Sequence, residues 1–302
     1  MRPVEKQDKI DADGNPAVGV IGGSGLYDMD ALEEREEVRI TTPFGDPSDA
    51  IVSGRLGGRK VCFLPRHGRG HRILPTELNH RANIYALRSL GVRFIIAVTA
   101  VGSLREECRP RDIVLPLQFF DRTSRREQHT FFGRGIVAHV AFGDPICPQL
   151  HSILADVAQQ HHEGKVHPRG TYVNMDGPAF STRAESELNR KMGFDVIGMT
   201  NVAEAKLARE AEISFATLAM VTDYDCWKVE EEPVNAQTVI GHLTANAEAA
   251  KKIVAETIVR IPEDSAWESH RSLDMALVTA KELWPKDATD SLQAILGRFM
   301  DR

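Results

Sequence analysis

Residues 18–25 read VGVIGGSG, an apolar, β-branched run that ends in three glycines and a serine. Residues 94–103 read FIIAVTAVGS and follow the same plan, with small and hydroxyl-bearing residues after the apolar run. Short apolar runs bounded by glycine are typical of strands. In open α/β sheets, ligands bind beyond the carboxyl ends of the strands. The two stretches therefore predict a sheet with a ligand site at the ends of its strands.

Strands and helices alternate along the rest of the chain. The predicted strands are short apolar or β-branched runs over residues 18–21, 38–42, 50–55, 60–65, 94–99, 113–115, 136–141, 171–175, 196–199 and 213–222. The predicted helices span residues 76–90, 149–161, 183–191, 203–210 and 236–259. This alternation predicts an α/β fold with a central mixed β-sheet flanked by helices.

No internal repeat and no linker rich in Pro, Gly or Ser divides the chain, so we expect one main domain. A polar N-terminal tail, disordered or extended, is expected over residues 1–16. The main domain is expected over residues 17–262. The spacing of apolar residues after it predicts one or two further helices, a C-terminal helical extension over residues 263–302.

The composition excludes several classes of protein. The 302 residues are 42% hydrophobic and 26% charged, which is typical of a folded globular chain. Lys and Arg number 37 against 43 Asp and Glu, and the net charge of −6 argues against sequence-independent binding to nucleic acid. The four cysteines form no C-x-x-C pair, so no metal site is predicted. Neither a signal peptide nor an apolar run of membrane-spanning length is apparent, so we expect a cytoplasmic protein without membrane contact.

Three segments that follow predicted strands have the character of anion-binding loops. Residues 22–25 (GGSG) permit close backbone approach and add a serine hydroxyl. Residues 66–71 (RHGRGH) form a cationic loop, in which arginine can bind phosphate bidentately and histidine adds a donor. Residues 99–103 (TAVGS) offer hydroxyls at a strand end. Each segment alone also fits a plain turn or a solvated loop.

Two further segments lie between a strand and a helix. Asn201 and Glu204 have the spacing of a helix N-cap pair, which puts Thr200 where a helix N-terminus attracts anions. Residues 175–181 (MDGPAFS) precede a predicted helix whose start has the capping-box pattern S/T-x-x-E. Phe180 could stack on a flat ligand or could simply pack in the core.

Two carboxylates close the longest predicted strand. Asp223 and Asp225 stand at i and i+2, and therefore point to the same side if the strand continues. Two carboxylates held close together raise the pKa of one of them, which allows it to donate a proton near neutral pH. A solvated acidic strand end is the alternative interpretation.

Taken in order, these segments carry a family resemblance. The chain resembles the S-methyl-5′-thioadenosine phosphorylases of the trimeric purine nucleoside phosphorylase family over about residues 18–259. The matching motifs are GGSGL (22–26), TPFG (42–45), RHGR (66–69), TAVGSL (99–104), DGP (176–178), STRAES (181–186), GMT (198–200) and TDYDCW (222–227).

The resemblance implies a homotrimeric pentosyltransferase of methionine and purine salvage. It implies that phosphate, as co-substrate, cleaves S-methyl-5′-thioadenosine to adenine and 5-methylthio-α-D-ribose 1-phosphate, with no metal and no organic cofactor. Carried over by motif, the phosphate-binding residues are Ser24, Arg66, His67, Thr99, Ala100 and Thr200. The nucleoside-binding residues are Met199 at the ribose, Phe180, Ser181, Asp223 and Asp225 at the base, and Val239, Ile240 and a neighbouring subunit's His139 at the 5′-methylthio group.

In the mechanism that this implies, phosphate attacks the anomeric carbon as oxocarbenium character develops, and Asp223 protonates N7 with Asp225 beside it. Three alternatives remain. The chain could act on 6-oxopurine nucleosides or methylthioinosine, it could be a hydrolytic nucleosidase, or it could be a nucleoside sensor without activity. The paired carboxylates argue against a 6-oxo group, and the cationic loop argues against hydrolysis by water.

Overall fold

The computed structural model describes residues 16–23, 25–26, 29, 31–228, 236–263 and 266–300, without the side chains of residues 236–240 and 243–246. The predicted tail over residues 1–16 therefore lies almost wholly outside the described residues. Within these ranges, no helix combines the length and the apolar character needed to cross a bilayer.

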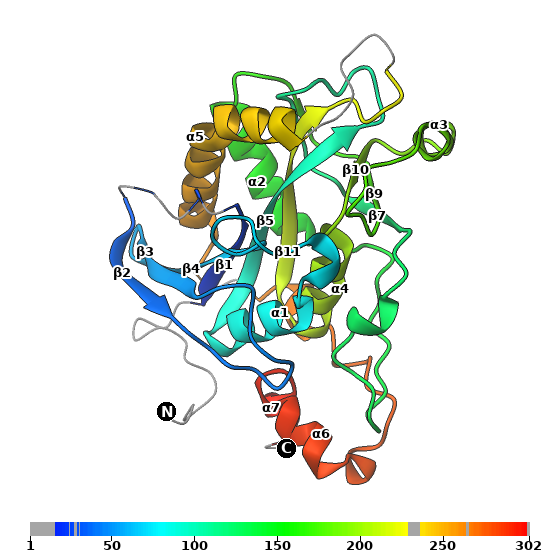
Figure 1. Cartoon of the computed structure of the whole chain (residues 1–302). Coiled ribbons are helices and arrows are strands. Elements are labelled where there is room, and N and C mark those ends of the chain that lie inside the picture. The colour runs from blue at the N-terminus through cyan, green and yellow to red at the C-terminus, as the bar shows by residue number, and fades with distance from the viewer. Residues whose placement is uncertain are drawn as a thin grey trace.

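A mixed sheet forms the centre of the molecule (Figure 1), as the alternating pattern predicted. Its main path runs β2-β3-β4-β1-β5-β10-β9-β7, while β11 pairs with β5 and β6, and β6 pairs with β8. The strands are β1 (Ala17–Gly22), β2 (Glu33–Val38), β3 (Ile51–Leu56), β4 (Arg59–Pro65), β5 (Val92–Ser103), β6 (Ile113–Val114), β7 (Gln118–Asp121), β8 (Val166–His167), β9 (Thr171–Asn174), β10 (Val196–Gly198) and β11 (Ser214–Asp223).

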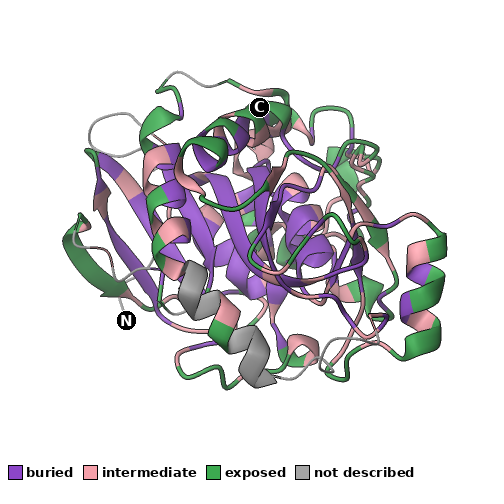
Figure 2. Cartoon of the chain, turned by 90° about the horizontal axis from the view of Figure 1, so that it is seen from above, coloured by how far each residue is buried: buried purple, intermediate pink, exposed green. Residues whose placement is uncertain are grey.

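Helices cover this sheet in two pairs. α2 and α5 pack together and against β11, while α1 and α4 pack together and against β5. The inner strands are buried, whereas α3 projects from the edge with exposed faces (Figure 2). The α-helices are α1 (His80–Ser89), α2 (Pro148–His161), α3 (Arg183–Lys191), α4 (Asn201–Glu210), α5 (Ala236–Arg260), α6 (Lys286–Ser291) and α7 (Gln293–Met300).

The long strand β5 creates the opening where a ligand can bind. Its residues 94–97 pair in parallel with residues 18–21 of β1. β1 ends at Gly22, but β5 continues, and its last residues Gly102 and Ser103 pair antiparallel with β10. The sheet therefore splits between the ends of β1 and β10, beside the carboxyl ends of β4 and β11. This is the place where α/β sheets bind their ligands.

Two strand predictions are wrong, and the reasons are physical. The strand predicted over residues 38–42 lies earlier, because the edge strand β2 is EEREEV and carries charge instead of an apolar alternation. A charged, exposed edge strand protects the sheet from pairing with other chains. No strand forms over residues 136–141, where Ala138 makes only a single bridge to Leu277. The helix predicted over residues 76–90 is divided into a short 3-10 turn (Pro75–Glu77) and α1.

The C-terminal segment packs onto the main core. Leu292 and Leu296 belong to the principal buried cluster, and the backbone N–H of Ala294 donates to the Tyr85 hydroxyl on α1 at 3.3 Å. Arg298 forms ion pairs with Glu212 and Asp274. These contacts attach α7 to the same core as the sheet.

Candidate active site

Three of the predicted segments meet where β1 ends. The backbone N–H of Arg66 donates to the carbonyl of Gly22 at 2.9 Å, and its Nη1 donates to the carbonyl of Val98 at 2.9 Å. Thr99, the next residue on β5, is buried. The parallel pairing of β1 with both β4 and β5 dictates this convergence, because the ends of parallel strands meet at one edge. Ser24, in the glycine loop, lies outside the described residues.

The guanidinium of Arg66 is directed at a protein carboxylate. Its Nε and Nη2 donate to the two carboxylate oxygens of Glu204 at 2.5 and 2.9 Å, and Nη2 also reaches the Ile21 carbonyl at 3.5 Å. With the bond to Val98, four of the five N–H groups of Arg66 have partners, which leaves one on Nη1. The bidentate face of Arg66, which the sequence assigned to phosphate, is occupied by Glu204.

Glu204 acts differently from the N-cap partner that its spacing predicted. The N-cap of α4 is Thr200 and the helix begins at Asn201, so Glu204 lies inside the helix. The Nδ2 of Asn201 donates to Glu204 at 3.2 Å, while its Oδ1 accepts from the Thr217 hydroxyl at 2.6 Å. Thr200 therefore stands at the N-terminus of a helix, as expected, and its side chain makes no capping bond.

His67 belongs to the same end of the site but carries no charge at neutral pH. Its Nδ1 donates to the Ile73 carbonyl at 2.8 Å, and its ring stacks on His71 with centroids 4.3 Å apart. Burial, followed by the charge of Arg66, lowers the pKa of His67 to about 4. Because Nδ1 donates to a carbonyl, the remaining ring nitrogen of neutral His67 is an acceptor. The RHGRGH loop is thus less cationic than its sequence suggests.

The carboxylate pair lies at the end of β11. The backbone N–H of Asp225 donates to Asp223 Oδ1 at 2.8 Å, and the Thr222 hydroxyl donates to Oδ2 at 2.7 Å. The strand ends at Asp223, and Asp225 adopts a left-handed conformation with φ of 53°. A turn, and not the continued strand of the prediction, brings the two side chains together.

Both carboxyl groups favour their protonated forms more than an ordinary aspartate does. Burial raises the pKa of Asp223, and the negative charge of Asp225 raises it further, against the hydrogen bond from Thr222. Burial likewise raises the pKa of Asp225, and hydrogen bonds from the Ser186 and Ser181 side chains oppose this rise. The end of β5 lies against the pair, since a Cβ added at Gly102 would lie 2.9 Å from Asp223 Oδ1.

The loop over residues 175–181 joins the carboxylate pair to Met199. The Cys226 thiol donates to the Ser181 carbonyl at 3.3 Å, beside Asp225. A Cβ added at Gly177 would lie 2.5 Å from the Met199 sulfur, so Met199 packs directly on this loop. Phe180, 45% exposed, leaves its ring available. The capping box predicted for Thr182 and Glu185 is present at the start of α3.

Residues 17–259 match the model of the Phosphorylase superfamily. The chain belongs to this superfamily. It is 52% identical over 283 residues to the S-methyl-5′-thioadenosine phosphorylase of Koribacter versatilis, covering 93% of this chain and 96% of the relative. It is 54% identical over 282 residues to that of Chloroflexus aurantiacus, covering 93% and 98%.

Solved structures agree with this superfamily assignment. A methylthioadenosine phosphorylase from an antarctic soil metagenomic library matches with a TM-score of 0.89 and 48% identity, over 93% of this chain and 99% of the other. The methylthioadenosine phosphorylase of Schistosoma mansoni in complex with adenine matches with a TM-score of 0.81 and 38% identity, over 89% and 100%. The expected fold class is confirmed.

The described part of the structure does not place at this site the three residues that the sequence assigned to the 5′ end of the nucleoside. The side chains of Val239 and Ile240 lie outside the described residues, although His242 on the same helix is close enough to lower the pKa of Asp223. His139 is exposed, and its backbone N–H donates to the Ala276 carbonyl. Its segment lies beside α6, where Arg134 forms an ion pair with Asp287.

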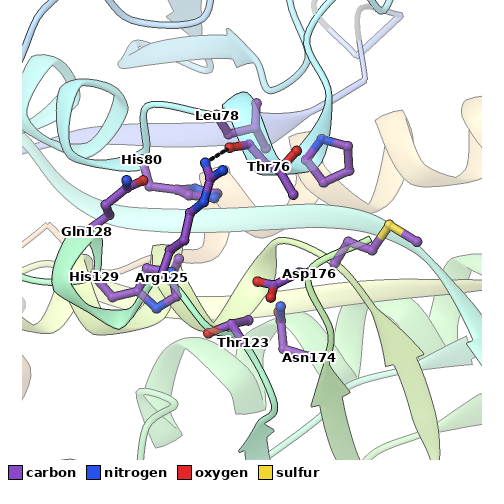
Figure 3. Close-up of a pocket in the computed structure, with 12 residues that line it drawn as sticks. Thr76, Leu78, His80, Thr123, Arg125, Gln128, His129, Asn174 and Asp176 are labelled. Atoms are coloured by element: carbon purple, nitrogen blue, oxygen red, sulfur yellow. Dashed lines mark hydrogen bonds between the residues drawn. The ribbon is translucent and has the colours of Figure 1, made fainter. Parts of the chain in front are cut away.

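A small pocket adjoins Met199 (Figure 3). It holds about 30 Å³ and reaches the predicted site residues only through Met199. Arg125 donates to the Thr76 carbonyl at 2.6 Å and lies beside His80 and His129. Within the described part of the chain, neither histidine Nδ1 has a partner. Burial lowers the pKa of His80 to about 3 and that of His129 as well, so both rings are neutral.

Sequence reasoning missed the role of Glu204 and overlooked Tyr172, both of which are buried near Arg66. Glu204 is separated from Arg66 by 138 positions, so no local pattern reveals their ion pair. Tyr172 is fully buried, and a Cβ added at Gly198 would lie 1.9 Å from its hydroxyl oxygen. Gly198 is therefore required for Tyr172 to fit beside Met199. The only signal was the glycine itself before the Met-Thr pair.

Proposed function

We propose that the chain is a pentosyltransferase that cleaves S-methyl-5′-thioadenosine with phosphate, releasing adenine and 5-methylthio-α-D-ribose 1-phosphate. One observation carries the proposal: an oxyanion end and a buried carboxylate pair lie at the same opening of the sheet. The relatives at about 50% identity, which span almost the whole chain, support the same reaction. Such an enzyme serves the salvage of methionine and purines.

At the oxyanion end, the proposed phosphate ligands are Ser24, Arg66, His67, Thr99, Ala100 and Thr200. The N-terminus of α4 and the free N–H of Arg66 supply donors to the anion. Neutral His67 can accept a hydrogen bond from a protonated phosphate oxygen. Inorganic phosphate acts as co-substrate, and we propose no further cofactor and no metal.

At the base end, Asp223 is the proposed general acid. Cleavage of the bond between ribose and purine leaves negative charge on the base and oxocarbenium character on the sugar. The bound phosphate stabilises the cation and then attacks it, while the proton of Asp223 passes to N7. The raised pKa of Asp223 supports this role, since an ordinary aspartate would already be ionised.

The carboxylate pair, Asp223 with Asp225 beside it, is proposed to accept from the 6-amino group of adenine. Burial of both carboxyl groups supports this role, because an amino donor would offset the cost of their desolvation. A 6-oxopurine would set an acceptor against that acceptor, which disfavours methylthioinosine and inosine. Met199 is assigned to the ribose, Phe180 and Ser181 to the base, and Val239 with Ile240 to the 5′-methylthio group.

We further propose a cytoplasmic homotrimer in which His139 completes a neighbour's 5′ pocket. Exposed apolar side chains surround this histidine, namely Val137 at 43%, Val278 at 65% and Met275 at 97% exposure, and such groups mark protein contacts. Mixing His139→Ala protein with Asp223→Asn protein tests the arrangement, because hybrid sites alone would regain activity. A fully active monomer in sedimentation would contradict it. Residues 17–262 are the proposed catalytic domain and residues 263–302 its helical extension.

The function is tested by reactions with and without phosphate in which the release of base is measured by chromatography. S-methyl-5′-thioadenosine should yield adenine only when phosphate is present, and faster than adenosine, inosine or methylthioinosine yield their bases. Equal release without phosphate would indicate a nucleosidase. Faster cleavage of the 6-oxo substrates would favour the alternative purine nucleoside phosphorylase. Binding without any release would indicate a sensor.

A further inference from the structure

The arginine at the phosphate end is supported by a buried chain of side chains. Thr217 on β11 donates to Asn201, Asn201 donates to Glu204, and Glu204 accepts two hydrogen bonds from Arg66. The four residues come from β11, α4 and the loop after β4, and are between 0% and 3% exposed. Side chains that are hydrogen-bonded in series and excluded from water hold one another in one arrangement.

These hydrogen-bonded side chains also offset the positive charge of Arg66 in the loop over residues 66–71. Arg66 is cationic, but the Glu204 carboxylate lies against it, and neutral His67 adds no charge. Burial alone would lower the pKa of Arg66, yet the interaction with Glu204 outweighs it and the pKa is raised. Phosphate at this end therefore meets oriented N–H groups and a helix N-terminus, and not a free guanidinium.

We propose that Glu204 is a positioning residue: it fixes the orientation of Arg66 and neutralises it, so that one Nη1 N–H is directed to phosphate. The inference rests on the proposed function, since it concerns the co-substrate of that reaction. Asn201 and Thr217 extend the same support by orienting the Glu204 carboxylate. None of the three contacts the nucleoside in this assignment.

Glu204→Gln is the decisive variant, and Glu210→Gln is its matched control. Glutamine keeps one acceptor for Arg66 but turns an amide N–H₂ toward the second N–H, which breaks the two-point contact. Glu210 is also buried on α4, where it accepts from Thr130 and from the backbone of Phe131, away from Arg66. Both variants alter a buried glutamate on one helix, but only the first alters the phosphate site.

The measurements are KM for phosphate at saturating nucleoside, KM for nucleoside at saturating phosphate, and direct phosphate binding by calorimetry. Glu204→Gln should raise KM for phosphate about tenfold or more and leave KM for nucleoside within about twofold. Glu204→Asp, which retains the charge on a shorter side chain, should recover part of the loss. Glu210→Gln should leave KM for phosphate within about twofold of the parent.

Thr217→Val keeps the proposal testable if Glu204→Gln fails to fold. It removes one hydroxyl from the far end of the chain and should raise KM for phosphate about threefold. An unchanged KM for phosphate in Thr217→Val and Glu204→Gln, or equal changes in Glu204→Gln and Glu210→Gln, would overturn the proposal. If the parent binds phosphate but releases no base, the proposed function falls, and weaker binding in Glu204→Gln would still support the role of Glu204.

Discussion

The two ends of the site are built in different ways. At the phosphate end, Arg66, Glu204 and Thr200 are at most 4% exposed, Arg66 and Glu204 are bonded to each other, and Arg66 is also bonded to β5. At the base end, Asp225 sits in a left-handed turn, and Phe180 is 45% exposed. The bidentate face of Arg66 is occupied before any ligand arrives, whereas Phe180 at the other end keeps an exposed ring that a ligand would cover.

This difference separates the tasks of the two ends. Oriented dipoles that are already in place stabilise developing charge without reorganisation, which suits the site of an attacking anion. Buried acceptors, in contrast, discriminate strongly, because a ligand that fails to pair with them leaves their desolvation uncompensated. We therefore expect mutations at the phosphate end to affect folding and phosphate together, and mutations at the base end to affect activity and substrate choice without a loss of stability.

Arg66→Ala should give the largest effect and should change both the stability of the fold and the use of phosphate. It leaves the Glu204 carboxylate buried without its partner, which costs about 3–5 kcal/mol of unfolding free energy. KM for phosphate should rise steeply. Urea denaturation and phosphate kinetics measure the two effects. Stability equal to that of the parent would show that the ion pair is not part of the folded core.

Asp223→Asn should lower activity without the loss of unfolding free energy expected for Arg66→Ala. Removing the general acid should lower the specificity constant for S-methyl-5′-thioadenosine about 10²–10⁴-fold. The amide can donate to O6, so the preference should move toward methylthioinosine or inosine, and Asp225→Asn should shift it less. The measurement is the ratio of specificity constants for the amino and oxo substrates. An unchanged ratio would mean that other residues recognise the base.

His80, in the pocket behind Met199, should make stability depend on pH. Its folded pKa of about 3 lies below the ordinary histidine value, so the unfolded chain binds the proton more readily. Its contribution is complete above about pH 6.5 and is lost as the pH falls toward 3, by up to about 1.4 kcal/mol per unit. Urea denaturation between pH 4.5 and 8 should therefore show a steeper decline for the parent than for His80→Phe. Parallel curves would contradict the buried neutral ring.

Phe180→Ala should give the smallest effect. An exposed ring contributes little to folding, so the unfolding free energy should change by less than about 0.5 kcal/mol. Loss of stacking on the purine should weaken nucleoside binding by about 0.5–1.5 kcal/mol and leave KM for phosphate unchanged. Parallel measurement of both KM values tests this. A change in KM for phosphate would show that the two ends are not independent.

Local rules explain how much of the fold the sequence could predict. The limits of α3 and its capping box follow from Thr182 and Glu185, which interact within one turn. The buried strands β1, β5 and β11 follow from apolar runs. The edge strand β2 was not predicted correctly, because its charged residues carry no apolar pattern. Only its pairing with β3 makes it a strand.

The same distinction between local patterns and contacts with distant residues holds for the site. Sequence reasoning selected Asp223 and Asp225 correctly as neighbours, but for the wrong reason, because a turn at Asp225 replaces the expected strand. It selected Arg66 but assigned its bidentate face to phosphate, since the partner Glu204 is distant in sequence. The assignment of His139 to a neighbour's pocket depends on a second copy of the chain, which no single-chain pattern can reveal.

The most direct test of the central claim is a phosphorus NMR measurement on the purified protein with S-methyl-5′-thioadenosine and inorganic phosphate. The claim is that the phosphate held beside Arg66 becomes bonded to the sugar as Asp223 protonates the base. The account predicts that the inorganic phosphate signal declines while a sugar 1-phosphate signal grows, one for each adenine released. Release of adenine and free 5-methylthioribose with an unchanged phosphate signal would contradict it.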